Sequence, residues 1–320
     1  MAIRKLLLLL KPLDPYPFLP PEGVSRIKNP QVLRYLESRC TVHKDAINFC
    51  QEILHKKPVE WRPISRSDLL HPIHDVDMVI TVGGDGTLLQ ASHLIDDSVP
   101  VLGVNSDPTR TEEVEALSDQ FDASRSTGHL CAATVENFEQ VLDDILFGKR
   151  VPSKVSRIAV KLNSKPLTTQ ALNDVLIAHP CPATASRFSF KINSKDDGES
   201  CSKTVSSRSS GLRICTAAGS TAAMHSAGGS VMPISSRDLQ YMVREPISPG
   251  SSPGLMHGFV RPDQSMDVNW FSNRGSIYID GCHVRYTMQL GDTIEISSDA
   301  PVLNVFLPPH ALTRNISKVI

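Results

Sequence analysis

Long apolar runs and an excess of charge of one sign are both missing from this 320-residue chain. No stretch is long enough to span a bilayer, which excludes a membrane protein. The 33 Lys and Arg residues nearly balance the 34 Asp and Glu residues, so no overall field attracts nucleic acid or an anionic membrane. We therefore expect neither nucleic acid nor a membrane as a partner. What remains is a globular chain of one large or two ordinary domains.

Cysteine pairs are missing as well. The seven cysteines are scattered and never stand at a Cys-x-x-Cys spacing, so neither a disulfide framework nor a zinc site is indicated. The apolar run at Lys5–Leu10 is interrupted by Lys11 and Pro12, and no small-residue cleavage site follows, so we expect a buried strand there and not a signal peptide. The last three residues do not match the peroxisomal tripeptide. We expect a protein of the cytoplasm.

The first part of the chain alternates strand and helix signals. Apolar runs that stop at glycine or polar residues predict buried strands, and apolar residues at i, i+3, i+4 and i+7 predict helices with one buried face. Strands are expected at 5–10, 77–82 and 99–104, and helices at 31–57 and 135–146. This order favours an α/β fold with a Rossmann-like or flavodoxin-like parallel-sheet domain over residues 1–150.

After residue 150 the helical periodicity nearly disappears and short strand signals follow one another. The sequence therefore predicts a β-rich, sandwich-like second domain over residues 151–300. Residues 301–320 form a C-terminal segment that we expect to pack back on the first domain. Strands are expected at 155–162, 171–178, 187–192, 276–279, 283–289, 293–296 and 302–306, and loops at 194–210 and 246–262.

A glycine-rich segment, Gly83-Gly84-Asp85-Gly86-Thr87, lies between a predicted strand and a helix-like stretch. Its glycines let the backbone approach an anion closely, and the N–H groups of a helix start favour negative charge. It is neither the Gly-x-x-x-x-Gly-Lys-[Ser/Thr] loop nor the Gly-x-Gly-x-x-Gly fingerprint. Because a carboxylate cannot attract phosphate, Asp85 is expected to hold a substrate hydroxyl or accept its proton. The structural alternative is a tight turn with Asp85 as a helix cap.

A second segment is built from small residues. It runs from Thr216 to Ala223 and continues at Ser226-Ala227-Gly228-Gly229. The pattern predicts a turn that enters a helix, with hydroxyl and amide groups free at the helix start. A pure packing role for the small side chains is the alternative.

Together these segments resemble the signature motifs of the NAD kinase family. Gly-Gly-Asp-Gly-Thr is similar to a motif that NAD kinases share with diacylglycerol and sphingosine kinases and, more loosely, with phosphofructokinases. The second segment decides among them, because it is similar to the family's Thr-Pro-Thr-Gly-Ser-Thr-Ala-Tyr…Ser-Ala-Gly-Gly. Asn173-Asp174 stands where the family usually has Asn-Glu, and Asp280-Gly281 is a weaker match. The likeness covers residues 5–310 and is closest to the plant NADH kinase type.

The resemblance implies an ATP-dependent kinase, with Mg²⁺ accompanying the ATP, that phosphorylates the 2′-hydroxyl of the adenosine ribose of NADH or NAD⁺. It also implies that an α/β half and a β-rich half meet at the active site, and that the protein is a homodimer. Asp85 would be the catalytic residue. The phosphate or ATP-binding residues would be Gly83, Gly84, Gly86 and Thr87. The dinucleotide-binding residues would be Asn105, Asn173, Asp174, Arg208, Thr221, Ala222 and Ser226.

Departures from the family pattern bear on substrate choice. Ala223 replaces the family's tyrosine, and Ser210 stands where many members carry an aspartate. A carboxylate near the nicotinamide favours the cationic, oxidised ring, so its loss predicts that this enzyme uses NADH at least as well as NAD⁺. Two alternatives stay open. A lipid kinase shares the first motif, and a non-catalytic NAD(P)(H)-binding sensor is allowed by the alanines at 217, 218 and 223.

Overall fold

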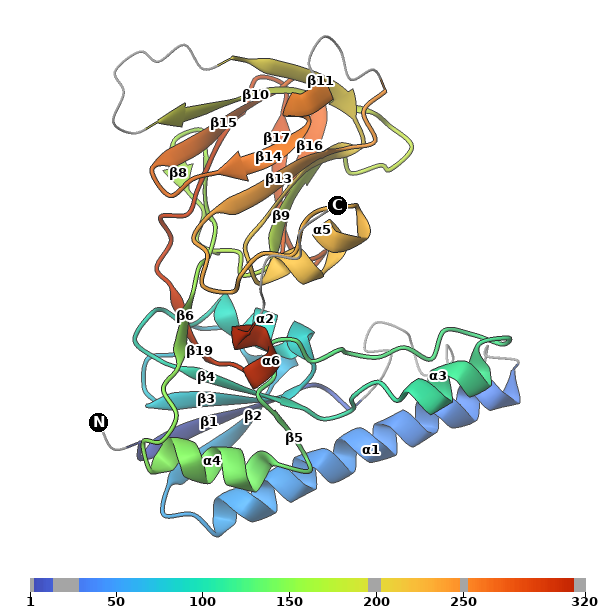
Figure 1. Ribbon diagram of the computed structural model, residues 1–320, viewed down its shortest axis with the longest axis vertical. Helices are drawn as coiled ribbons and strands as arrows, with labels where there is room; N and C mark the ends of the chain where they lie inside the picture. Colours follow the sequence, from blue (N-terminus) through green and yellow to red (C-terminus); the bar gives the residue numbers. More distant parts are fainter. Residues whose placement is uncertain (1–2, 14–28, 195–202, 248–252, 314–320) are drawn as a thin grey trace. The chain divides into compact units, whose positions relative to one another are not determined.

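The computed structural model describes residues 3–13, 29–194, 203–247 and 253–313. The chain divides into two compact units (Figure 1). The first comprises Met1–Ser153 with Asn304–Ala311, and the second Lys154–Leu303 with Leu312–Ile320. The end of the expected C-terminal segment, residues 314–320, lies outside the described residues.

A parallel sheet forms the centre of the first unit, with the strand order β2-β1-β3-β4-β19-β6 and β5 paired to β4. Its strands are β1 (Lys5–Leu10), β2 (Glu60–Ser65), β3 (Met78–Gly83), β4 (Val101–Asn105), β5 (Ala133–Thr134), β6 (Ser153–Val155) and β19 (Leu303–Phe306). The β1–β2, β1–β3, β3–β4, β4–β5 and β4–β19 pairs are all parallel. β3 and β4 are buried along their whole length, as expected for strands covered on both faces.

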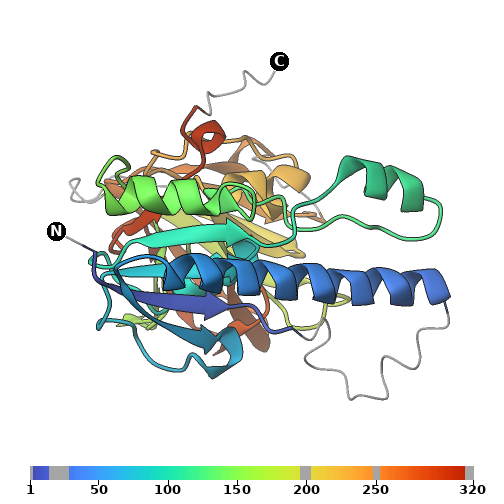
Figure 2. The ribbon, with the colours of Figure 1, turned by 90° about the horizontal axis from the view of Figure 1, so that it is seen from below.

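Helices cover both faces of this sheet. α1 (Pro30–His55) and α4 (Phe138–Leu146) lie on one face, as Figures 1 and 2 show, and their apolar side chains share one core with the strands. α1 begins where the Asn29 side chain accepts the Gln31 N–H at 2.9 Å. α2 (Asp85–Ser92) lies on the opposite face in Figure 1. The shorter helices of this unit are η2 (Arg66–Asp68), α3 (Thr111–Leu117) and α6 (Pro309–Leu312).

The second unit is a sandwich of two antiparallel sheets, ordered β11-β10-β15-β18-β7-β8 and β14-β13-β12-β9-β16-β17. Both sheets contribute to one apolar core. In this core the Phe188 ring stacks on the Trp270 ring, with the ring centroids 6.3 Å apart. The first sheet contains β7 (Ala159–Leu162), β8 (Lys165–Pro166), β10 (Ser186–Ser194), β11 (Val205–Ser209), β15 (Gln264–Trp270) and β18 (Thr293–Ser297). The second contains β9 (Asp174–Ala178), β12 (Gly211–Cys215), β13 (Leu239–Arg244), β14 (His257–Val260), β16 (Arg274–Ile279) and β17 (Val284–Gln289). Its short helices are η3 (Gly219–Thr221), α5 (Ala223–Ser226) and η4 (Pro253–Leu255).

The predicted fold class is confirmed, but several predicted boundaries are wrong. The segment 155–162 is not one strand, because β6 and β7 belong to different sheets. The predicted loops at 194–210 and 246–262 contain β11 and β14; residues 195–202 and 248–252 lie outside the described residues. Strands β2, β12, β13 and β15 are not predicted either, and of these β12, β13 and β15 lie inside their sheets. β11 and β14 are at sheet edges, where one side of the strand pairs and polar residues are tolerated. Their composition therefore suggests loops.

Candidate functional site

The glycine-rich segment forms the junction between β3 and α2. β3 ends at Gly83, Gly84 is the N-cap, and Asp85 is the first helical residue. A Cβ on Gly84 would stand 2.4 Å from the Ser126 side chain, so only glycine permits this close approach. Around Gly86, by contrast, a Cβ would meet no described atom within 4 Å outside its own helix. The junction is thus packed on one side and open on the other, where an anion can reach the helix start.

The Asp85 carboxylate is oriented by a loop that lies more than 40 residues further along the chain. Oδ2 accepts the His129 N–H and Oδ1 accepts the Leu130 N–H, each at 2.9 Å. The Cys131 thiol donates to Oδ1 at 3.6 Å, and burial, helped by the Asp85 charge, raises the pKa of that thiol. Asp85 therefore does not cap α2. Oδ2, which accepts one N–H group, keeps lone-pair capacity for a further donor, such as a hydroxyl.

Thr87 presents a buried hydroxyl to the same junction. The residue is 1% exposed, and its Oγ1 atom has no hydrogen-bond partner among the described residues. A Cβ on Gly83 would stand 2.2 Å from this oxygen, so the hydroxyl lies directly against the Gly83 backbone. An unpartnered buried hydroxyl is costly, and a ligand oxygen at this junction would remove that cost.

Asn105 and Ser126 join the second loop to the sheet. Asn105 is the last residue of β4, is 4% exposed, and donates from Nδ2 to the Ser126 carbonyl at 3.2 Å. The Ser126 Oγ atom accepts the Asp85 N–H at 3.1 Å. The structure thus brings Asn105 and Asp85 together through Ser126, a residue that the sequence motifs do not include. Asn105 positions the loop with its side chain in this structure.

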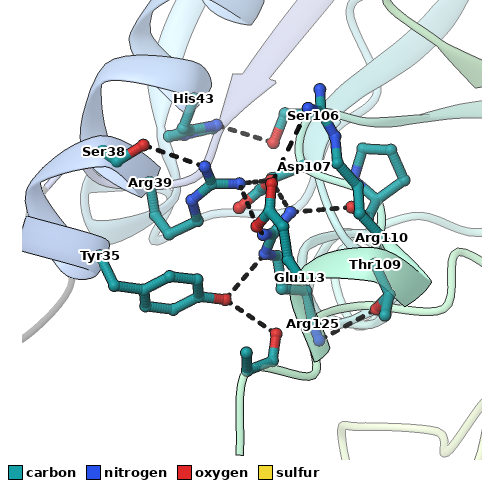
Figure 3. A network of polar contacts seen from close by, with 12 residues as sticks. Tyr35, Ser38, Arg39, His43, Ser106, Asp107, Thr109, Arg110, Glu113 and Arg125 are labelled. Atoms are coloured by element: carbon teal, nitrogen blue, oxygen red, sulfur yellow. Dashed lines mark hydrogen bonds and ion pairs between the residues drawn. The ribbon is translucent and has the colours of Figure 1, made fainter. Parts of the chain in front are cut away.

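An ionic network, shown in Figure 3, holds the start of this loop. Arg125 is only 7% exposed at its side chain and donates to Asp107 at 2.9 Å, to the Tyr35 hydroxyl at 2.9 Å and to Glu113. Arg39 of α1 pairs with Asp107 at 3.1 Å. Asp107 follows β4 and Arg125 precedes Ser126. Their ion pair therefore joins the two ends of the segment 107–125, which contains α3.

His43 of α1 connects two backbone segments beside Gly83. Its Nδ1 atom lies 2.8 Å from Ser106 Oγ and its Nε2 atom 3.0 Å from the Lys11 carbonyl. Burial lowers the pKa of His43, so the neutral ring donates to the carbonyl and accepts from the hydroxyl. Ser106 in turn donates its N–H to the Gly83 carbonyl at 2.9 Å. His43 therefore helps to fix the backbone at Gly83, where the glycine-rich segment begins.

In the second unit, Asn173 and Asp174 are fixed at the start of β9 by the Asp280 carboxylate. Asp280 accepts the N–H groups of Leu172 at 2.8 Å, Asn173 at 2.7 Å and Asp174 at 3.0 Å. The Asp174 side chain forms an ion pair with Arg213 of β12. Burial raises the pKa of Asp174, while Arg213 opposes that shift. The weak Asp280-Gly281 motif thus supports the stronger one.

The small-residue segment packs tightly at its start and is open at its end. A Cβ on Gly219 would stand 2.1 Å from the Asn173 carbonyl, so glycine is required for this approach. Thr216 donates its N–H to the same carbonyl at 3.0 Å. Thr221 is half-buried, and Ala222 and Ser226 are exposed at α5. The segment therefore combines the packing role of its first residues with accessible positions at its helix.

Arg208 lies away from these residues on the edge strand β11. It is exposed and stands opposite Arg187 of β10 in the antiparallel register. Ser210, two residues further along the chain, donates its N–H to the Arg244 carbonyl at 2.9 Å. The second unit thus brings Asn173, Asp174 and the 216–221 turn into direct contact, whereas no described contact joins Arg208 to them.

A metal cage and a membrane-spanning helix are both missing from the described residues. Within the described ranges, His, Cys, Asp and Glu side chains do not gather in groups of three or more that could hold a metal ion. Nor does any described helix have the length and apolar character needed to cross a bilayer.

Comparison with known proteins identifies the family. The family model of the ATP-NAD kinase N-terminal domain matches residues 33–107. An NADH kinase of Arabidopsis thaliana is 79% identical over 98% of this chain and 98% of its own length. A probable NADH kinase of Oryza sativa subsp. japonica is 56% identical over 98% of this chain and 99% of its own. The chain belongs to the NAD kinase family and is a kinase.

The fold agrees with this assignment. The crystal structure of an NAD kinase from Archaeoglobus fulgidus in complex with ATP superposes with a TM-score of 0.64 at 18% identity, covering 96% of this chain and 95% of that one. At this identity the likeness shows the fold alone.

Proposed function

We propose that this protein transfers the terminal phosphoryl group of ATP to the 2′-hydroxyl of the adenosine ribose of NADH, and also of NAD⁺, giving NADPH or NADP⁺. The near full-length likeness to plant NADH kinase supports the reaction and the substrate. The structural support is the Asp85 carboxylate, which is oriented by the His129 and Leu130 N–H groups and lies next to an open helix start.

In the proposed reaction the 2′-oxygen attacks the terminal phosphorus while the bond to the leaving ADP oxygen breaks. Asp85 orients the hydroxyl and accepts its proton. The Thr87 hydroxyl and the amides of Gly84 and Gly86 bind phosphate oxygens. Asn173, Asp174, Arg208, Thr221, Ala222 and Ser226 bind the dinucleotide, and Asn105 positions the loop that orients Asp85.

Mg²⁺ is proposed to arrive with ATP, bound chiefly by the phosphate oxygens. The described residues fit this arrangement, because they offer single carboxylates such as Asp85 and no three-ligand cage. When bound, the ion offsets the charge of the triphosphate. We further propose a homodimer in the cytoplasm, as the family resemblance and the reduced, scattered cysteines favour.

Neither alternative function gains support. A lipid kinase has no counterpart for the 216–229 segment, and a non-catalytic sensor would not need an oriented carboxylate at the glycine-rich junction. The near full-length relatives are named as kinases of NADH.

The test is an Asp85→Asn variant assayed for NADPH formation from NADH and ATP. The amide keeps the shape but cannot accept the proton, so kcat should fall by roughly 10²- to 10⁴-fold. Its NH2 group also faces one of the His129 and Leu130 N–H donors, which costs about 1–3 kcal/mol, so kcat is compared at a temperature where the variant is fully folded. Asp45→Asn, on the exposed side of α1, is the matched control and should keep the wild-type rate. A near wild-type kcat for Asp85→Asn would remove the assigned role.

A further inference from the structure

Arg213 is a charged residue in the middle of β12, and the other four residues of this strand are buried. In β12, Leu212 and Ile214 point to the sandwich core, so Arg213 lies on the outer face of the sheet. The register places it opposite Leu176 of β9, which in turn stands opposite Tyr278 of β16. Despite this outer position, only 15% of the Arg213 side chain is exposed.

These residues line a cavity. Asp174, Leu176, Arg213, Tyr278 and the turn at Gly281–Cys282 line a solvent-open cavity of about 260 Å³ within the second unit. Leu176 and Tyr278 supply apolar and aromatic walls, and Asp174 and Arg213 supply the charged ones. Such a space admits one planar ring but not a whole dinucleotide.

The two charged residues leave unused hydrogen-bonding capacity in this cavity. One Arg213 terminal nitrogen pairs with Asp174 Oδ2, but the buried Nε–H has no partner among the described residues. The Asp174 carboxylate has a second oxygen, and a carboxylate only accepts. Arg213 and Asp174 therefore place a guanidinium donor next to a carboxylate acceptor in the lining of this cavity. Both are held in place, because Asp280 fixes the Asp174 backbone and Asp174 fixes the guanidinium.

We propose that Arg213 is a specificity-determining residue that, with Asp174, binds the donor–acceptor edge of one planar ring of the dinucleotide. The ring oxygen or nitrogen accepts from Arg213 Nε, and the adjacent amino group donates to Asp174. Both the carboxamide of nicotinamide and the amino-purine edge of adenine have this chemistry. The inference rests on the proposed function, since it places the dinucleotide in this unit.

The experiment compares NADH with two analogues on the full-length protein. In one, 1-deazaadenine replaces adenine; in the other, thionicotinamide replaces nicotinamide, so that the acceptor of one ring at a time is lost or weakened while its amino group stays. The wild type should discriminate against one analogue by roughly 10- to 100-fold in kcat/KM, as expected for a lost hydrogen bond to a charged group. That analogue identifies the ring.

Arg213→Met should lower kcat/KM for NADH toward the value for that analogue and abolish the discrimination. Arg213→Lys keeps the charge beside Asp174 but not the Nε–H, so it should fold like the wild type and still lose discrimination. Arg261→Met is the control, because it removes an exposed Arg–Asp pair that does not line the cavity. Wild-type discrimination in Arg213→Lys, or none in the wild type, overturns the inference.

Calorimetric binding of NADH and both analogues without ATP separates this inference from the proposed function. If the wild type binds selectively but forms no NADPH or NADP⁺, the kinase proposal fails and the ring-binding cavity stands once Arg213→Lys loses the selectivity. If NADPH forms and the Arg213 variants bind all three dinucleotides as the wild type does, only the inference fails. A wild type that neither binds nor phosphorylates a dinucleotide overturns both.

Discussion

Arg125 is the most deeply buried arginine of the network in Figure 3, and its replacement tests whether that network holds the Asp85 loop. Arg125→Met keeps the length of the side chain and removes its bonds to Asp107, Glu113 and Tyr35. Breaking a fully buried ion pair costs about 3–5 kcal/mol. Here the Asp107 and Glu113 side chains are 19% and 29% exposed, and both keep their ion pairs with Arg39. We therefore expect the free energy of unfolding to fall by about 2–3 kcal/mol.

Urea unfolding and thermal melting would measure this cost. For a unit of this size, about 2–3 kcal/mol corresponds to a melting shift of roughly 4–12 °C. Arg62→Met is the matched control, since Arg62 and Asp75 form a pair at 3.0 Å with both side chains more than half exposed. Exposed pairs contribute about 0–1 kcal/mol. An Arg125→Met variant no less stable than Arg62→Met would refute the reasoning.

The same variant has a catalytic consequence. Arg125 is followed by Ser126, which accepts the Asp85 N–H, and by the N–H groups that orient the Asp85 carboxylate. If the network fixes this loop, kcat should fall below the control at a temperature where both variants are fully folded. Arg125→Lys should recover only part of the rate, because an ammonium cannot form the guanidinium's fork of bonds. Full kcat in folded Arg125→Met would show that the loop holds its shape without the network.

Three further predictions follow from other residues. Thr87→Val replaces an unpartnered buried hydroxyl with a methyl group, so the free energy of unfolding should stay equal or rise by about 1 kcal/mol. The value of kcat/KM for ATP should fall roughly tenfold, and full activity would contradict the phosphate contact. Ser210→Asp should move the ratio of NADH to NAD⁺ kcat/KM about fivefold toward NAD⁺, and an unchanged ratio would remove the charge argument. Because burial lowers the pKa of His43 below its ordinary value of 6.5, the folded state binds its proton less readily than the unfolded chain. The stability from neutral His43 is therefore present above pH 6.5 and is lost as the pH falls below it, so urea unfolding of His43→Asn should show a weaker acid dependence than the wild type.

Strands β1, β3 and β4 could be predicted because each is a short, buried apolar run, whereas β2, which is partly exposed at the edge of the sheet, shows no such run. β3 and β4 are covered on both faces, so nearly every position is apolar or small, and the run can be recognised without knowledge of the neighbouring strands. β11 and β14 could not be recognised, because an edge strand keeps polar residues on its free side and reads like a loop. The helix predicted from residue 135 begins three residues later, at Phe138. Val135 has the right spacing, but it follows directly on β5.

Some residues of the candidate site could also be predicted from the sequence, and others could not. The glycine-rich junction and the 216–226 segment could be predicted because close backbone approach demands glycine and small residues at fixed spacing, which leaves a mark in the sequence. The residues that orient Asp85 left no such mark. His129 and Leu130 act through their backbone N–H groups, for which any non-proline residue suffices, and Ser126 is 41 residues distant in the chain.

Arg213 shows how such a residue can still be found. An arginine between two core residues of a strand costs free energy to desolvate, and it persists only where a partner compensates. Asp174 compensates one terminal N–H group, and the buried Nε–H remains. The sequence shows only the anomaly, Leu212-Arg213-Ile214, while the register shows what the arginine faces. A charge that interrupts an apolar strand next to a recognised motif is therefore worth testing as a ligand contact, because packing alone does not account for its desolvation cost.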